Sequence, residues 1–191
     1  MYDLHSILIQ LKKEDTPLHG VMVRCVRCFY QWLDPTLWEG SALFELWAQE
    51  LELIYGDLRQ RLSPNAKTDA GSLGDRFGFD TPPELPRLLQ SIQTFYSVLI
   101  KFIAWNTLRG ATPEPPLTEL LSGRAFVNRG IRNFCGDDWY IWPLDIWDPA
   151  LETQCEELRA CLESFDTCPE GSTLSPDSLS RIYETVVPPA L

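Results

Sequence analysis

The sequence has little of what catalytic and membrane proteins use. It holds only two histidines in 191 residues, and it contains no GxxxxGK[ST] phosphate loop and no GxSxG nucleophile turn. No run of about 20 apolar residues is free of charge, because Lys101 interrupts the best candidate, so a membrane span is not expected. The first residues lack a basic start and a small-residue cleavage site, so a signal peptide is not expected either. These absences favour a cytoplasmic protein.

Basic residues are in the minority. Sixteen Lys and Arg stand against 27 Asp and Glu, which gives a formal net charge of −11. A chain this acidic is repelled by phosphate backbones, so non-specific binding of nucleic acid by the chain alone is not expected. The charge suits a basic partner, or it serves solubility.

The cysteines do not form a metal-binding or redox pattern. Cys25 and Cys28 have CxxC spacing, but a structural zinc site needs four ligands and no second close pair follows. Redox CxxC pairs lie at a helix N-terminus after a strand, whereas this pair falls within a predicted helix. We therefore expect free thiols in the core, in a reducing compartment. The six cysteines are Cys25, Cys28, Cys135, Cys155, Cys161 and Cys168.

The longest helical pattern runs over Leu85–Leu108, and it predicts the central helix of an all-α domain. Its apolar residues recur at steps of three and four, the period of a helix that buries a broad face. A narrow polar stripe lies between them, so the helix should have neighbours on most sides. We expect the Lys101 stem to lie along apolar neighbours while its ammonium reaches solvent or an acid. The stripe consists of Gln90, Thr94, Ser97 and Lys101.

Caps and periodicity predict the remaining elements. The pairs Thr16-Pro17, Asp148-Pro149 and Ser175-Pro176 each combine a capping residue with proline at the first helical position. We predict five to seven helices, with an irregular aromatic segment near 125–147. Within it, residues 125–134 are either a strand or irregular, and Gly123 ends a short helix before it. Further helices are expected over 2–13, from Pro17 to about Leu33, and from a Ser41 cap to about Leu62. The chain reads as one domain, 1–191, with N-terminal helices (1–63), the central helix (84–109) and a C-terminal aromatic segment with helices (137–191).

Three segments, taken in order, resemble the region upstream of the catalytic domain in large adenine-specific DNA methyltransferases. This family includes fused restriction–modification enzymes and related phage-defence methyltransferases. Residues 94–105, TFYSVLIKFIAW, resemble its TY-L-LL-K-LIAY helix, from which Phe95 and Tyr96 depart. Residues 138–143, DWYIWP, resemble its DFFSWYL segment, and residues 179–188, LSRIYETVVP, are similar to its LK-LYQ-LVP helix. Residues 38–58 look like its W---F---YG helix more loosely.

The resemblance implies a helical scaffold or connector without catalytic residues. In the family the S-adenosylmethionine-binding domain follows these segments, but this sequence stops at Leu191 and has neither the Gly-rich cofactor motif nor an NPPY-type motif. No catalytic, cofactor-binding or metal residue of the family has a position here. Thr94, Lys101 and Ala104 are then structural motif positions. The implied partner is a methyltransferase domain or subunit that binds S-adenosylmethionine, and DNA is contacted only through that complex.

Aromatic residues near the C-terminus are the predicted partner surface. Exposed aromatic clusters mark partner sites, although these side chains would equally well fill the core. The predicted contact residues are Trp139, Tyr140, Trp142, Trp147, Tyr183 and Val187.

Two other functions remain open from the sequence. The charge of −11 suits an acidic DNA mimic that inhibits a DNA-processing enzyme, although acids and bases are interspersed along the chain. A small enzyme that uses His19 or the Cys25–Cys28 pair is the third possibility.

Overall fold

The computed structural model describes residues 4–34, 44–50, 73–108, 110, 112–135, 140–165 and 176–187. These residues are helical or irregular and include no strand, which confirms the all-α prediction. Helices with defined ends are α1 (Leu4–Lys12), α2 (Pro17–Trp32), α6 (Leu85–Leu108), α7 (Leu117–Leu121), α8 (Arg124–Val127), α9 (Pro143–Ile146), α10 (Pro149–Glu163) and α11 (Pro176–Val186). Residues 44–50 and 73–76 are also helical. Of the described helices, none has the length and apolar character needed to cross a bilayer.

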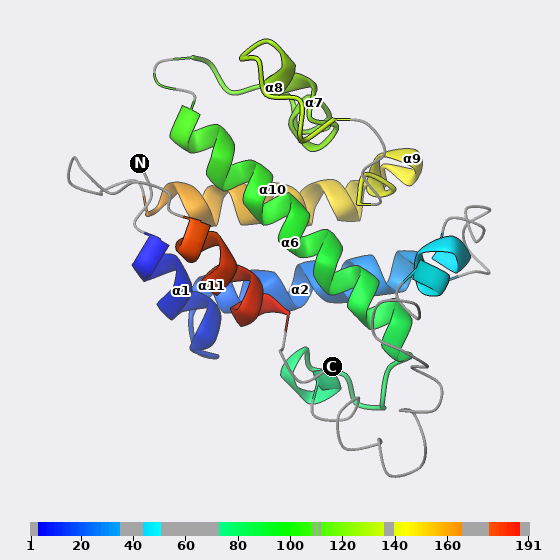
Figure 1. Ribbon diagram of the computed structural model, residues 1–191. Coiled ribbons are helices and arrows are strands. Elements are labelled where there is room, and N and C mark those ends of the chain that lie inside the picture. The colour runs from blue at the N-terminus through cyan, green and yellow to red at the C-terminus, as the bar shows by residue number, and fades with distance from the viewer. Residues whose placement is uncertain are drawn as a thin grey trace.

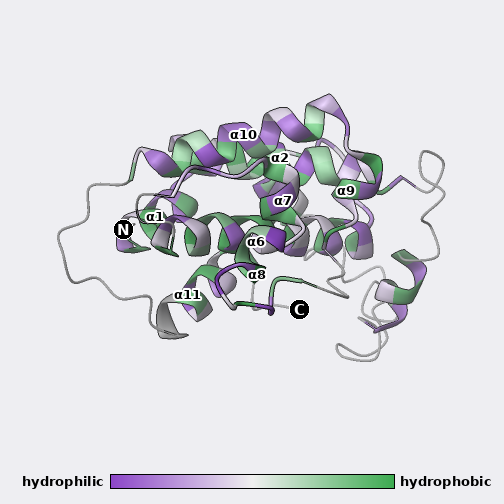
Figure 2. Cartoon of the chain, turned by 90° about the horizontal axis from the view of Figure 1, so that it is seen from above, coloured by the Kyte–Doolittle hydropathy of each residue, from purple (hydrophilic) through white to green (hydrophobic). Residues whose placement is uncertain are grey.

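Helix α6 has the central position that its apolar pattern predicts. It runs diagonally across α2 and α10, and it also contacts α7 and α11 (Figure 1). Seen from above, α6 lies between the α2–α10 pair and α11 (Figure 2). Neighbours on several sides explain why so few of its positions are polar.

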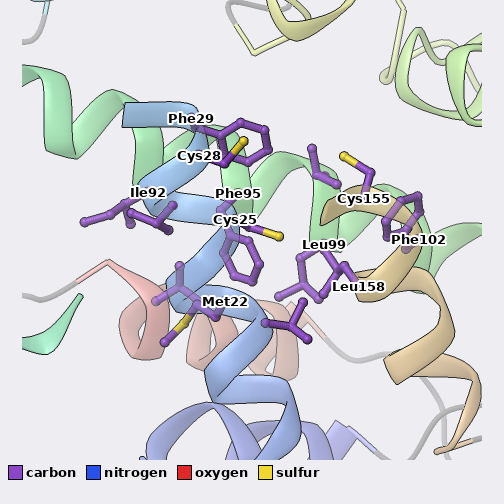
Figure 3. Close-up of a cluster of buried hydrophobic side chains, with 14 of the residues drawn as sticks. Met22, Cys25, Cys28, Phe29, Ile92, Phe95, Leu99, Phe102, Cys155 and Leu158 are labelled. Atoms are coloured by element: carbon purple, nitrogen blue, oxygen red, sulfur yellow. The ribbon is translucent and has the colours of Figure 1, made fainter. Parts of the chain in front are cut away.

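Helix α2 shares the centre with α6. It packs on α6, α10 and α1, and apolar side chains from three helices interdigitate at this junction (Figure 3). Burial of side chains at such a junction is the main stabilising contribution to a helical domain. The labelled residues are Met22, Cys25, Cys28 and Phe29 from α2, Ile92, Phe95, Leu99 and Phe102 from α6, and Cys155 and Leu158 from α10.

Two helices begin at the predicted caps. Thr16 is extended, and its hydroxyl accepts a hydrogen bond from the His19 amide at 3.3 Å. The Asp148 carboxylate accepts one from the Ala150 amide at 2.7 Å. In both cases proline follows at the first helical position, where its missing N–H costs nothing. The expected starts of α2 and α10 are thus confirmed, and α11 begins at Pro176 as predicted.

The segment between α6 and α10 is more helical than predicted. The described part of 117–147 holds three helices of one turn each, so five to seven helices was too low a count. The strand alternative for 125–134 is wrong, because α8 and turns occupy this range. Gly123 does follow the end of α7, with a φ of +79° that favours glycine.

Some predicted features lie outside the described residues. These are the Ser41 cap, the helix from residue 51 to Leu62, Asp137, Asp138, Trp139, Cys168, Ser175 and the last residues to Leu191.

Candidate functional site

The first motif position, Thr94, joins α6 to the aromatic segment. Its side chain is fully buried, and its hydroxyl donates to the Gln90 carbonyl at 2.7 Å. The same oxygen accepts a hydrogen bond from the Trp142 indole N–H at 2.9 Å. Donor and acceptor capacity of the hydroxyl are therefore both used, and the buried indole N–H has its partner.

Trp142 belongs to the core. It is 1% exposed, and its ring meets Phe29 of α2 edge to face at 5.9 Å between centroids. Trp142 was predicted either to contact a partner or to fill the core. The structure has it filling the core, since a partner has no access to the indole. Its burial follows from tertiary packing that local sequence does not encode.

The second motif position, Lys101, corrects an expectation. Its ammonium does not reach solvent, because the residue is only 2% exposed. Instead Nζ donates to the Leu121 carbonyl at 2.8 Å. That carbonyl lies at the C-terminal end of α7, where the helix itself supplies no donor. Lys101 thereby fixes α7 on α6, and the edge-to-face pair of Trp105 and Phe126, at 5.9 Å, adds a contact between α6 and α8.

The third motif position, Ala104, is half-buried on α6 and packs against the core. All three motif positions contact other parts of the same chain. They lie on the helix that other segments are packed against.

The predicted contact residues fall into three groups. Trp142 and Val187 are buried. Tyr140, Trp147 and Tyr183 are half-buried. Trp139 lies outside the described residues.

Tyr140 and Tyr183 both lie near Tyr96, a residue that sequence reasoning missed. Tyr96 meets Tyr183 edge to face at 5.2 Å, and it lines a pocket together with Tyr140. Burial raises the pKa of the Tyr96 phenol, so the ring stays neutral. The sequence period predicts that Tyr96 and Ile100, four residues apart on α6, share one face of the helix. It does not predict that residues 133–135 lie beside them, because those residues carry no periodic signal.

Three thiols of the core are shielded. Cys25, Cys28 and Cys155 are buried where α2 meets α10 (Figure 3). Burial, with smaller contributions from neighbouring groups, raises the pKa of Cys25 well above its usual range, that of Cys28 to about 11 and that of Cys155 to about 12. The five described cysteines are free, and the described ranges hold no cluster of three or more His, Cys, Asp or Glu placed to bind a metal.

We expect thiol labelling to separate two classes of cysteine. At about pH 8, a disulfide reagent should modify the half-exposed Cys135 in the folded chain, because the reagent attacks accessible thiolate, and it should modify Cys161 more slowly, because burial raises the pKa of that thiol. Cys25, Cys28 and Cys155 should react only as the chain unfolds. Peptide mapping by mass spectrometry reads each site, and equal labelling rates for Cys25 and Cys135 would contradict the arrangement.

His19 is the one buried histidine among the described residues. Burial lowers its pKa, and the nearby Arg76 guanidinium lowers it further, while Glu14 and Asp15 oppose the shift. Arg76 itself donates to the Thr185 carbonyl of α11. Protonation of His19 would therefore place a second cation beside the contact that ties residues 73–76 to α11.

His19 should make folding stability depend on pH. Its folded pKa lies below its unfolded pKa of 6.5, so the unfolded chain binds more protons as the pH falls. The stabilisation is present above pH 6.5 and is lost as the pH drops towards the folded pKa. Replacing His19 by Asn should flatten the slope of unfolding free energy against pH by at most about 1.4 kcal/mol per pH unit, the limit for one proton. Denaturant titrations between about pH 7 and pH 5 measure the slope, and an unchanged slope would rule out this role.

Helix α6 thus binds two other segments of the chain through Thr94 and Lys101, and Tyr96 on the same helix packs against Tyr183. No protein-family model, no curated protein sequence and no solved structure matches the chain.

Proposed function

We propose that the chain is a non-catalytic helical scaffold that packs against a methyltransferase domain in a DNA adenine methyltransferase, restriction–modification or phage-defence complex. The proposal starts from the sequence resemblance at residues 94–105, 138–143 and 179–188. One structural observation supports it most: the two polar motif positions, Thr94 and Lys101, are both buried and both bind other segments of the same chain.

Burial of this kind suits a scaffold. A polar group removed from water must be hydrogen-bonded, and a fully paired one fixes the relative position of the elements that it joins. Thr94 holds the segment before α9, and Lys101 holds the end of α7. Helix α6 would thus keep the surface that meets the partner in one shape.

The partner would bind the half-buried aromatic residues Tyr140, Trp147 and Tyr183. Tyrosine and tryptophan are enriched at protein interfaces, because they supply a large apolar area and one polar tip. Tyr140 is already held by its hydroxyl, which donates to the Gln93 amide oxygen at 2.5 Å. A side chain fixed in advance loses less entropy when the partner binds.

S-adenosylmethionine would be bound by the partner domain, and DNA would be reached only through the complex. The net charge of −11 is consistent with indirect contact. The five free thiols agree with a reducing, cytoplasmic setting.

Two measurements test the proposal. In calorimetry the isolated chain should give no binding heat with S-adenosylmethionine, and tight binding would overturn the proposal. Co-expressed with the catalytic domain of a methyltransferase encoded beside it, the chain should elute as a stable complex with methylation activity retained. Failure to associate would overturn it as well.

Variants locate the contact surface. Trp147→Ala and Tyr183→Ala should each weaken the complex at least about tenfold, the usual effect of removing an interface aromatic anchor. Leu46→Ala is the matched control, because Leu46 is apolar and 53% exposed but lies outside the predicted surface.

Association that abolishes methylation would favour the acidic-inhibitor alternative instead. Against that alternative, Glu157 pairs with Arg24 at 2.8 Å and Glu114 with Arg159 at 3.6 Å, which breaks up the acidic surface.

A further inference from the structure

A pocket of about 440 Å³ opens beside the middle of α6. One wall comes from α6 itself, a second from residues 133–135, and a third from Tyr140. Its volume lies within the range of small-molecule sites, about 300–1,000 Å³. The lining residues are Tyr96, Ser97, Ile100, Asn133, Phe134, Cys135 and Tyr140.

Each aromatic side chain of the pocket wall also contacts a residue that does not line the pocket. Tyr183 of α11 packs edge to face on Tyr96 at 5.2 Å, and the Tyr140 hydroxyl donates a hydrogen bond to the Gln93 side-chain oxygen. Phe126 of α8 lies 4.5 Å from the Phe134 ring, centroid to centroid. Walls fixed by contacts outside a pocket do not have to be ordered by the ligand, which favours binding.

The lining chemistry selects the ligand. The described residues that line the pocket include no Lys, Arg, Asp or Glu, so none of them supplies a counter-ion to a charged ligand. Three aromatic rings and Ile100 offer apolar faces and edges for another ring. The Ser97 hydroxyl and the Asn133 amide offer hydrogen bonds to one polar tip.

We propose that this pocket binds a neutral, planar aromatic group that carries one hydrogen-bonding substituent, of the phenol or indole class. The inference stands apart from the proposed scaffold function, since it concerns the isolated chain and needs no methyltransferase.

The test is a titration of the full chain with p-cresol, followed by chemical-shift changes in ¹H–¹⁵N spectra. Shifts should gather at Ser97, Ile100 and the Asn133 side-chain amide, with a dissociation constant of about 1 mM, which is reasonable for so small a ligand. Two matched compounds define the chemistry. 4-Methylcyclohexanol lacks the ring electrons and 4-hydroxyphenylacetate adds a negative charge, and each should bind at least about tenfold more weakly.

One substitution closes the pocket without removing a wall. Ser97→Leu places a larger side chain in the pocket and is well tolerated by a helix, so binding should fall at least about tenfold with the melting temperature unchanged. Ser180→Leu, at an exposed position of α11, is the control and should bind as the wild type does. No shifts at about 10 mM p-cresol, shifts spread over the whole surface, or full binding by the Ser97→Leu chain would each overturn the proposal.

A second titration tests whether the bound ring belongs to a protein side chain or to a free small molecule. N-acetyl-tyrosine amide and N-acetyl-tryptophan amide carry the same rings on a peptide unit. Tighter binding of these compounds than of p-cresol and indole would assign the pocket to an aromatic side chain of a protein, and weaker binding would assign it to a free small molecule.

Discussion

Replacing Trp142 by alanine is expected to lower the free energy of unfolding by about 3–5 kcal/mol, the usual cost of removing a large aromatic side chain from a core. The indole is 1% exposed, it packs against Phe29, and its N–H is hydrogen-bonded to Thr94. The substitution opens a cavity and leaves Thr94 without this donor. Urea unfolding followed by far-ultraviolet circular dichroism measures the change, which should appear in the midpoint rather than in the slope.

Two milder variants separate the ring from the hydrogen bond. Trp142→Phe keeps an aromatic ring but loses the N–H, and Thr94→Val removes the acceptor while keeping a similar shape. Each should cost about 1–3 kcal/mol, the range for leaving a buried polar group without its partner. In the double variant the losses should be less than additive, because both substitutions remove the same bond. Wild-type stability of Trp142→Ala would mean that the segment before α9 is not docked on α6.

Gly123→Ala should destabilise the chain by about 3 kcal/mol or more, combining backbone strain with overpacking. Gly123 has a φ of +79°, which side-chain-bearing residues rarely adopt. A Cβ here would lie 1.9 Å from the Phe134 carbonyl oxygen and 2.9 Å from Cys135 Sγ. Both neighbours would have to move, and one of them is backbone. Thermal and urea unfolding measure the loss.

Gly130→Ala is a matched control for Gly123→Ala. Gly130 has nearly the same φ, +77°, but a Cβ there would meet nothing within 4 Å. It should therefore show only the strain, about 1 kcal/mol. Equal losses at the two positions would show that the close approach of Phe134 to Gly123 does not exist in solution.

Local signals predicted the long helices well. The ends of α6 follow from apolar periodicity, and the starts of α2 and α10 follow from a capping side chain next to proline. These features depend on residues within one or two turns of each other. The same holds for Gly123, since a glycine directly after a short apolar run predicts a helix end.

Such local signals could not predict contacts between residues far apart in the sequence. The acceptor for Lys101 is a backbone carbonyl 20 residues away, and the acceptor for Trp142 is a hydroxyl 48 residues away. Nothing in the sequence near either residue indicates these partners. The one-turn helices between α6 and α10 are too short to show a period. The pocket was missed for the same reason, since its walls come from α6, from residues 133–135 and from Tyr140.

The pairing of α1 with α11 has a consequence for the order of folding. The two helices pack on each other although most of the chain separates them. Bringing such distant segments together costs loop-closure entropy. This cost becomes smaller once α2, α6 and α10 have formed the core, because the core already holds the intervening chain together. We therefore expect α1 and α11 to dock last and to open first, as one cooperative unit with early amide hydrogen exchange. Because Tyr183 on α11 supports Tyr96, a ligand held by the pocket should slow exchange in α11 without touching it.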